Sequence, residues 1–564
     1  MGYLILGVVM SIHALQSGFG HAMVAGSGDP SQALFYLAWL PHAIGAGDNP
    51  LFSHDLFAPN GVNLMANTSI LLPSLILSPI TVLFGPVTSF NLLMLLAPAT
   101  SALAAYIAIR RHVLWPPACF IGGLVYGFGP FELTDLRFGH FNLTLLAVPV
   151  LIFMALEDIL VNQQRSFTHD GILLFLAIAA QFFISLEMLA ICLVLSVIGV
   201  FLLALMAGRK LASHARHALG SIGVAAALSA GALAYPGWFF LDGPRHYLGP
   251  VWPFMGDLVA SLRSLVLPHG ETPGVGFISG GDGDYLGVVL LGVLIIAPLA
   301  CRSVPMLRFS CIMGAVAVML SLGYHLHIGN RSTAMALPGL AMEHLPLFDD
   351  LVMSRFAAFS DFFIGMAAAI VLDRLRVVHW PDGGHTYRNG SSQVSLLTAA
   401  VIVISLAPNV QGPFPVKNIY LPTAFRSSPI TMLSAGSVLL EYPLPSGYDA
   451  TALTYQAISG IPYRLIGGYG IVPGVDGHPS EQPGANALTE LFAAAELGKL
   501  ALPLDRSTLS ASRLELKRLD VAAVVVRAGF VGSAGIGAAL TEVLGRTATK
   551  WGHTEVWVAK DPVK

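Results

Sequence analysis

An acidic residue, Asp29, opens the segment Asp29-Pro30-Ser31-Gln32 within a long polar stretch, residues 23–69. Aspartate, proline and glutamine at these spacings are typical of a helix start, with Asp29 as the N-cap and Pro30 as the first helical residue. A carboxylate held at a helix start can also serve as a general base or as a metal ligand. The pattern therefore favours two compatible roles for Asp29, capping alone or capping together with chemistry.

A histidine and an aspartate, His54 and Asp55, stand side by side later in the same stretch. Such a pair could position an acceptor hydroxyl or share a proton. The turn signal Pro59-Asn60-Gly61 follows a few residues on, which favours a polar surface turn instead. Both interpretations stay open on the sequence alone.

Further ionisable residues lie at the ends of apolar runs. Glu132, Asp135 and His140 share the short segment FELTDLRFGHFN, where they could form a site or simply be solvated at a helix end. Glu187 interrupts two apolar runs in QFFISLEMLAI with almost no loop around it. A carboxylate so close to a bilayer needs a partner or a cavity, and it is usually functional.

Arginine dominates the basic residues between the apolar runs, since the only lysine before Lys417 is Lys210. Guanidinium groups bind phosphate bidentately and ammonium groups do not. The arginines outside the expected cytoplasmic turns therefore suit a phosphate group at headgroup depth. Salt bridges to neighbouring carboxylates such as Asp349 and Asp350 are the alternative. These arginines are Arg137, Arg245, Arg263, Arg331 and Arg355.

The composition indicates the surroundings in which these residues must work. The chain has 564 residues, of which 55% are hydrophobic and only 11% charged, and this is typical of a polytopic membrane protein. A net charge of -3 argues against nucleic acid as a partner. The four cysteines lie in or beside apolar runs without metal-like spacing, so we expect neither a zinc site nor a disulfide framework.

Apolar runs of about 20 residues and the inside preference of basic residues together predict a topology. Residues 70–84 are short and contain two prolines, so we expect an interfacial or re-entrant helix there. This places Arg110 and Arg111 in the cytoplasm with the other basic clusters. The start of the chain lacks a basic n-region and a cleavage site, which indicates a retained span and a cytoplasmic N-terminus. The eleven expected crossings are 3–22, 88–109, 117–131, 142–160, 171–186, 188–207, 218–236, 285–301, 309–324, 356–375 and 394–408.

The composition changes after about Pro408. Short β-like runs such as SVLLEYPL, YRLIGGYGIV and DVAAVVVRAGF alternate with the helical stretches ANALTELFAAAELGKL and SAGIGAALTEVLG. The alternation predicts a small α/β domain. We therefore expect a polytopic α-helical membrane module over residues 1–408, with a large first outer loop at 23–87, and an extracytoplasmic α/β domain over 409–564.

Several short motifs follow one another along the chain in a characteristic order. A first span leads to the long loop with Asp29, then to a proline-containing helix and a span ending in Arg110-Arg111. Later motifs are Gly139-His140-Phe141-Asn142 with Pro149, Ser185-Leu186-Glu187, and the approach from Leu345-Pro346 to Arg355. In this arrangement the chain resembles the GT-C superfamily of membrane glycosyltransferases, which take sugars from polyprenyl-phosphate donors. The C-terminal α/β domain resembles that of bacterial members.

The resemblance implies inverting transfer of a sugar at the outer face of the cell membrane, to a glycan, lipid or protein acceptor of the cell envelope. Asp29 would act as the base on the acceptor hydroxyl, together with His54 and Asp55. Arg355 would stabilise the leaving polyprenyl phosphate. His140, Glu187 and Arg245 would bind substrate. A single Gly-Asp-Pro stands where some members have paired acidic residues, so the use of a divalent metal ion stays an open question.

Two other classes of protein share the main features of the sequence. A transporter or flippase of a lipid-linked or anionic substrate would carry charges near the midplane and repeated broken helices. A non-catalytic envelope assembly protein would use its outer domain to bind partners. The glycosyltransferase interpretation requires Asp29, His54, Glu187 and Arg355 to converge on one outward-facing cavity.

Overall fold

The computed structural model describes the chain with short gaps. The described residues are 1–24, 28–251, 258–268, 283–301, 303–329, 331–345, 347–379, 385–387, 389–410, 412–427 and 429–559. Pro346, which belongs to one of the motifs above, lies outside them. Contacts within the chain define two compact units. Unit 1 comprises Met1–His13, Leu93–Ala234 and Trp252–Phe414, and unit 2 comprises Ala14–Leu92, Tyr235–Val251 and Pro415–Lys564.

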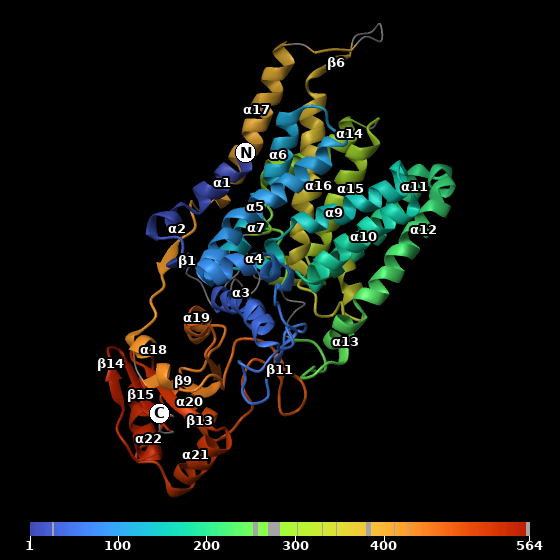
Figure 1. The fold of residues 1–564 in the computed structure, drawn as a ribbon. Coiled ribbons are helices and arrows are strands. Elements are labelled where there is room, and N and C mark those ends of the chain that lie inside the picture. The colour runs from blue at the N-terminus through green and yellow to red at the C-terminus, as the bar shows by residue number, and fades with distance from the viewer. Residues whose placement is uncertain are drawn as a thin grey trace. The chain divides into compact units, whose positions relative to one another are not determined.

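Unit 1 is mostly helical, and Figure 1 shows α9, α10, α11 and α12 running beside one another. Three helices cross a unit boundary, namely α2 (Ile12–Ser17), α5 (Pro86–Arg110) and α13 (Ala234–Asp242). The helices inside unit 1 are α1 (Gly2–Met10), α6 (Pro116–Gly127), α7 (Pro130–Phe138), α8 (Phe141–Thr144), α9 (Ala147–Glu157), α10 (Phe167–Phe182), α11 (Leu186–Ala207), α12 (Arg209–Ala232), α14 (Gly287–Ala300), α15 (Pro305–Ser321), α16 (Ala357–Arg374) and α17 (Asn389–Leu406), with the short helical turns η1 (Asp158–Asn162), η3 (Pro338–Met342), η4 (Met353–Phe356) and η5 (Ala407–Asn409) and the two-stranded pairs β4 (His325–Ile328) with β5 (Arg331–Ala336) and β6 (Val377–His379) with β7 (His385–Tyr387).

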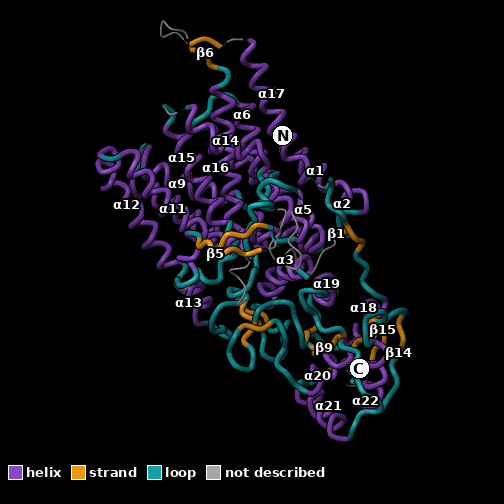
Figure 2. Tube along the Cα trace, turned by 180° about the vertical axis from the view of Figure 1, so that it is seen from behind, coloured by secondary structure: helices purple, strands orange, loops and turns teal. Residues whose placement is uncertain are grey.

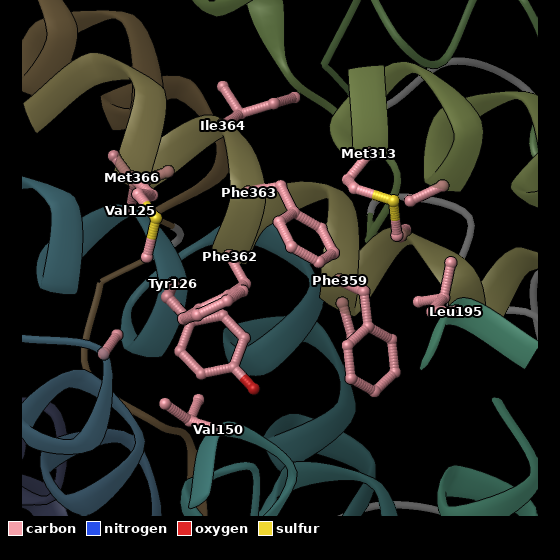
Figure 3. Packing of buried hydrophobic residues seen from close by; sticks show 14 of the residues in the cluster. Val125, Tyr126, Val150, Leu195, Met313, Phe359, Phe362, Phe363, Ile364 and Met366 are labelled. Atoms are coloured by element: carbon pink, nitrogen blue, oxygen red, sulfur yellow. The ribbon is translucent and has the colours of Figure 1, made fainter. Parts of the chain in front are cut away.

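The core of unit 1 is built around α16, whose residues are buried on every face from Ala357 to Ile370. A helix that is apolar all round belongs inside a helical assembly. Its rings Phe359, Phe362 and Phe363 pack against side chains from neighbouring helices (Figure 3). On another face, a Cβ added at Gly365 would lie 2.6 Å from the carbonyl oxygen of Gly122. Glycine at both positions therefore lets α6 and α16 approach closely, as small residues do in membrane helix pairs.

Four helical segments among the described residues are long and apolar enough to cross a membrane. A fifth is obtained if Ala212–Ala232 and Ala234–Asp242, which meet at 64°, form one bent span. Several expected spans correspond to shorter apolar helices, and the first, 3–22, is divided into α1 and α2. The count of eleven crossings and their orientation stay predictions. The four segments are Pro86–Arg110, Phe141–Asn162, Leu186–Ala207 and Met353–Arg374.

The segment around Glu132, which joins the expected spans 117–131 and 142–160, is not a simple loop, because Pro130–Phe138 form helix α7. Pro130 occupies the start of this helix, and Gly139 ends it in the left-handed conformation at φ 75°. Proline near the first position and glycine just past the last are the ordinary signals of a helix. The density of charged residues hid a pattern that the sequence contained.

Unit 2 combines the first polar stretch, residues 23–69, with residues 235–251 and the C-terminal region. Strand β1 pairs antiparallel with β8, so that Ala22 lies opposite Asn418. The helix expected at 70–84 is present as α4 (Leu71–Phe84). Contacts therefore group residues 14–92 with 415–564, while the division of the chain at residue 408 stays a prediction. The remaining elements before the main sheet are β1 (Ala22–Val24), α3 (Asp29–Ala46), β2 (Phe52–Ser53), β3 (Val62–Asn63), β8 (Val416–Asn418), α18 (Thr423–Ser427) and η6 (Pro429–Met432).

A five-stranded mixed sheet forms the C-terminal α/β part of unit 2, in the order β10-β9-β13-β15-β14. Figure 2 labels its strands β9, β14 and β15, with helices α20, α21 and α22 in the same part of the chain. Strand β9 pairs parallel with β10 and with β13. Strand β15 pairs antiparallel with β13 and with β14. Strand β13 is buried along its whole length, as a central strand covered on both faces should be. The bounds are β9 (Ser437–Tyr442), α19 (Thr451–Ile458), β10 (Tyr463–Leu465), β11 (Val472–Pro473), β12 (Pro479–Ser480), α20 (Ala487–Glu496), α21 (Arg506–Arg518), β13 (Val521–Arg527), α22 (Ser533–Leu544), β14 (Thr549–Trp551) and β15 (Thr554–Val558).

Candidate functional site

Asp29 is the first residue of α3, and Gly28 before it takes the N-cap position. The expectation that Asp29 is the N-cap is wrong by one residue, because the chain already has helical dihedral angles at Gly28. The Gln32 amide N–H donates to the carbonyl oxygen of Gly28 at 3.0 Å, so the backbone makes the first helical bond. This bond does not involve the Asp29 carboxylate.

One partner of Asp29 comes from the C-terminal part of unit 2. The hydroxyl of Tyr469 donates a hydrogen bond to Oδ1 of Asp29 at 3.1 Å. Gln32 contacts the same segment, since its Nε2 donates to the carbonyl oxygen of Tyr469 at 2.8 Å. Its Oε1 accepts a bond from the hydroxyl of Thr68 at 3.0 Å. The helix start, residues 67–68 and the segment around Tyr469 thus form one hydrogen-bonded cluster.

The electrostatics of this cluster follow from burial around a carboxylate. Burial, and then the charge of Asp29, holds the pKa of the Tyr469 and Tyr36 phenols well above the usual tyrosine value. The same two causes raise the pKa of the Glu481 carboxyl. Two neutral phenols and a second acid with increased proton affinity therefore surround Asp29, a combination often found at catalytic sites.

His54 and Asp55 have different surroundings although they are adjacent. The His54 side chain is exposed, and its ring lies edge-on to Phe52 with centroids 4.8 Å apart. Asp55 is partly buried, and its Oδ2 lies 3.9 Å from Nε2 of His42. Burial raises the pKa of Asp55, and His42 opposes that shift. The histidine that pairs with Asp55 is therefore His42, which the sequence interpretation missed.

Arg245 belongs to unit 2 as well, where it follows α13. It adopts a left-handed backbone conformation with φ 59°, which is uncommon for a residue other than glycine. Its side chain is half-buried, its Nε has no hydrogen-bond partner among the described residues, and burial lowers its pKa. Strained backbone of this kind is often found at functional positions. A half-buried guanidinium held in this way is suited to bind an anion.

Unit 1 contains the other three expected site residues. His140 N-caps the short helix α8, and its Nδ1 lies 2.8 Å from Oδ1 of Asp135. Glu187 lies in the first turn of α11, after the N-cap Ser185. Its Oε1 accepts the backbone N–H of Val352 at 3.0 Å, and its Oε2 accepts a hydrogen bond from Arg355. The partner that a carboxylate near the bilayer requires is thus Arg355.

The pairing of Glu187 with Arg355 leads to a stability prediction. We expect Glu187→Gln to lower the free energy of unfolding by about 2 kcal/mol, since both side chains are about a fifth exposed and the amide still accepts from Val352. Thermal unfolding of the purified protein in detergent measures the change, with exposed Glu343→Gln as the control. Equal unfolding temperatures for the two variants would show that the ion pair contributes nothing.

The expected site residues divide between the two units. Asp29, His54, Asp55 and Arg245 belong to unit 2, and His140, Glu187 and Arg355 belong to unit 1. Their convergence on one cavity stays a prediction. Within unit 2, the sequence interpretation missed Tyr469 and Glu481, and it gave Gln32 a place only in the helix start. The partners Asp29 and Tyr469 are 440 positions apart in sequence, so no local pattern could have found the contact.

No three His, Cys, Asp or Glu side chains in the described part of the chain are arranged to hold a metal ion. Among the described groups around Asp29, Glu481 is a second acid, while Tyr469 and Tyr36 are phenols. These residues do not make up a metal site.

No family model matches the sequence, and no curated protein sequence matches it either. Solved structures do match. The archaeal oligosaccharyltransferase AglB from Archaeoglobus fulgidus, in complex with an inhibitory peptide and a dolichol-phosphate, is 13% identical with a TM-score of 0.51, over 93% of this chain and 69% of AglB. The apo form of that enzyme is 12% identical with a TM-score of 0.50, and the match covers 93% of this chain and 69% of the enzyme.

A second match is the arabinofuranosyltransferase AftD from Mycobacteria, which is 13% identical with a TM-score of 0.54. The match covers 99% of this chain but 40% of AftD, so the chain spans less than half of that protein. At these identities the likeness shows the fold alone. Nearly the whole chain therefore has the fold of the GT-C membrane glycosyltransferases, and the resemblance noted in the sequence is confirmed at the level of the fold.

Proposed function

We propose that this chain is a membrane glycosyltransferase that moves a sugar from a polyprenyl-phosphate donor to a glycan, lipid or protein acceptor of the cell envelope, at the outer face of the membrane. The GT-C fold supports this reaction class, because the matched proteins are glycosyl-transferring enzymes and AglB was solved with a dolichol-phosphate. The observation that carries the proposal is the Asp29 carboxylate at the start of α3, which accepts a hydrogen bond from the Tyr469 hydroxyl and lies among neutral phenols.

In the proposed reaction Asp29 is the general base. An acceptor hydroxyl attacks the anomeric carbon of the donor while Asp29 takes its proton. The bond from that carbon to the phosphate oxygen breaks, and its electron pair leaves with the polyprenyl phosphate. Since phosphate is a good leaving group, no strong acid is needed on that oxygen. Attack from the face opposite the leaving group inverts the anomeric configuration.

The leaving phosphate gains negative charge, so cationic groups should stabilise it. We assign this role to Arg355 and Arg245, with His140 as a third contact to the donor. Glu187 holds Arg355 by an ion pair and so orients the guanidinium, and the remaining N–H groups of Arg355 are the ones that would bind phosphate. On the acceptor side, His54 and Asp55 would bind the sugar or hydroxyl group that Asp29 activates. No step of the proposal uses a metal ion.

Arg245 offers a separate test of donor binding. We expect Arg245→Ala to raise the KM for a polyprenyl-phosphate sugar about tenfold, since a charge-assisted bond to phosphate contributes about 1.5 kcal/mol. Arg245→Lys should recover only part of the affinity, because an ammonium group cannot bind bidentately. Initial rates at varied donor concentration give KM, and exposed Arg426→Ala is the control. A KM that stays unchanged in Arg245→Ala removes this residue from the donor site.

The proposal is tested with the full chain in liposomes. Radiolabelled glucose, mannose and arabinofuranose linked to undecaprenyl or decaprenyl phosphate are supplied together with a cell-envelope extract as the source of acceptor. Transfer predicts loss of label from the lipid fraction and its appearance in an acceptor, with free polyprenyl phosphate as the second product. Mass spectrometry of lipids that purify with the chain should also detect a polyprenyl-phosphate sugar. Absence of both results with every probe overturns the enzyme assignment.

One observation favours a second candidate function, a transporter or flippase. Asp361 is buried within the apolar segment Met353–Arg374, and its Oδ2 has no hydrogen-bond partner in the described part of the chain. Buried carboxylates within spans are common in transporters. The same liposomes decide between the classes. Movement of a labelled lipid-linked sugar to the opposite leaflet without transfer supports transport, and inertness in both assays supports an assembly protein.

A further inference from the structure

Tyr469 occupies a glycine-rich segment, Ile466–Ile471, that follows strand β10 in unit 2. Its hydroxyl reaches Oδ1 of Asp29 at 3.1 Å. The proposed mechanism assigns no role to this residue, although it is the side chain that donates to the proposed base.

The ring of Tyr469 is held between two glycines. A Cβ added at Gly28 would lie 2.9 Å from the ring and 2.9 Å from the carbonyl oxygen of Ser446. A Cβ added at Gly447 would lie 3.3 Å from the opposite edge of the ring. Contacts this short are tighter than ordinary van der Waals packing, so a side chain at Gly28 would displace the phenol. The ring position therefore depends on glycine beside it.

The backbone on either side of the ring is fixed too. Gln32 donates to the carbonyl oxygen of Tyr469 at 2.8 Å. Asn67 makes two bonds to Ile471, accepting its N–H at 2.7 Å and donating to its carbonyl oxygen at 3.0 Å. The N–H of Gly28 donates to the carbonyl oxygen of Gly447 at 2.7 Å. Two of these four hydrogen bonds join the segments around Tyr469 to the start of α3, and the other two join Ile471 to Asn67.

From this arrangement we infer that Tyr469 is a positioning residue that fixes the orientation of the Asp29 carboxylate toward the acceptor hydroxyl. The inference rests on the proposed function. A base must be held within a few tenths of an ångström of the productive geometry, and a misplacement of about 1 Å can cost about 100-fold in rate. A buried phenol with one fixed donor supplies this restraint, while a water molecule would leave the carboxylate free to rotate.

The charged and titratable groups near Asp29 define how the restraint acts on its proton affinity. Among the described residues they include Tyr36 on α3, Tyr469 after β10, and Glu481 after β12. The phenol of Tyr469 stays protonated over the working range, because burial and Asp29 raise its pKa. A donor to an ionised carboxylate favours the ionised form. Loss of the hydroxyl should therefore shift the protonation of Asp29 to higher pH.

The test is Tyr469→Phe in the full chain, assayed with the polyprenyl-phosphate sugar that the unmodified protein consumes. We expect kcat to fall about 10- to 100-fold with the donor KM changed by less than about twofold. The acidic limb of the pH profile should move to higher pH. Tyr463→Phe is the matched control, since that buried hydroxyl has no hydrogen-bond partner among the described residues. It should change neither kcat nor the pH profile.

A second variant separates orientation from the mere presence of the hydroxyl. Gly28→Ala keeps the phenol but displaces its ring, and it should lower kcat by a similar factor. If Tyr469→Phe retains the kcat and acidic limb of the unmodified protein, the inference is wrong. Failure of the proposed function looks different, since the unmodified protein would then transfer no sugar or Asp29→Asn would remain fully active.

Discussion

Replacing Asp29 with asparagine should lower the rate of sugar transfer by about 10²- to 10⁴-fold, the range lost when a general base is removed. Asparagine has nearly the same shape, and its side-chain oxygen can still accept the hydrogen bond from Tyr469. The helix start should survive, because Gly28 rather than Asp29 takes the N-cap position. The substitution therefore removes the charge and leaves the geometry of α3.

Single-turnover assays with a labelled polyprenyl-phosphate sugar measure this loss separately from product release. Asp48→Asn is the matched control, since Asp48 is an exposed acid of the same polar stretch, and its activity should be unchanged. Donor binding by Asp29→Asn should stay within about threefold of the unmodified protein if the carboxylate acts on the acceptor. Full activity of Asp29→Asn would falsify the assignment of the base.

The second large effect concerns a buried ion cluster in the C-terminal sheet. Nε of Arg527 lies 2.9 Å from Oε1 of Glu441, and one of its terminal nitrogens lies 2.7 Å from Oδ2 of Asp449. The guanidinium also lies over the ring of Phe530, 4.6 Å from its centroid. Arg527→Met would leave two acids without their cation inside the protein. We expect a loss of about 3–5 kcal/mol in the free energy of unfolding.

The pH dependence of this loss has a defined sign. Burial raises the pKa of Glu441 to about 7, although Arg527 opposes the shift. A carboxyl whose pKa is raised on folding contributes most stability when protonated, below its unfolded value of 4.5, and loses it as the pH rises through 7. Without Arg527 the carboxyl should bind its proton more tightly still. The loss in the free energy of unfolding caused by Arg527→Met should therefore be smaller at pH 5 than at pH 8.

The free energy of unfolding is measured by denaturant titration of the full chain, with amide hydrogen exchange in β13 as the readout closest to this cluster. Arg518→Met is the control, because Arg518 forms an exposed pair with Glu515 and its removal should leave the stability unchanged. The triple variant Arg527→Met, Glu441→Leu and Asp449→Asn should recover part of the loss, since apolar replacement of a buried ion cluster is often neutral. Equal stability of Arg527→Met and Arg518→Met would contradict the buried-cluster argument.

Local sequence patterns were enough to predict much of the secondary structure. The helices α4, α5, α20 and α22 and the strands β9 and β13 all lie where apolar periodicity or β-branched runs indicated them. Hydrophobic periodicity is the strongest signal that a single sequence carries. Helix α7 was missed because charges outweighed the signals of Pro130 and Gly139. The predicted topology rested on the distribution of basic residues. The lengths of the helices do not test which side of the membrane these residues face.

The site was less accessible to sequence reasoning for a physical reason. That Glu187 needed a partner followed from its apolar surroundings, yet its identity as Arg355 depends on a contact across 168 positions. Asp55 pairs with His42 rather than with the adjacent histidine, since neighbours in an irregular segment point in different directions. Tyr469 had no charge or motif to attract attention. Tertiary contacts between distant segments, which no local pattern encodes, select these partners.

The antiparallel pairing of β1 with β8 has a consequence for biosynthesis. Residues 22–24 leave the ribosome almost 400 residues before their partners 416–418. Asn67 and its partner Ile471 are separated by 404 positions in the same way. Closing such long loops is entropically costly, and it cannot happen before both ends have been translated. The segment that contains Asp29 therefore lacks its contacts with the C-terminal region while the membrane helices insert. A nascent chain released early, or one cut before residue 471, should be catalytically silent even with all of its helices in the bilayer.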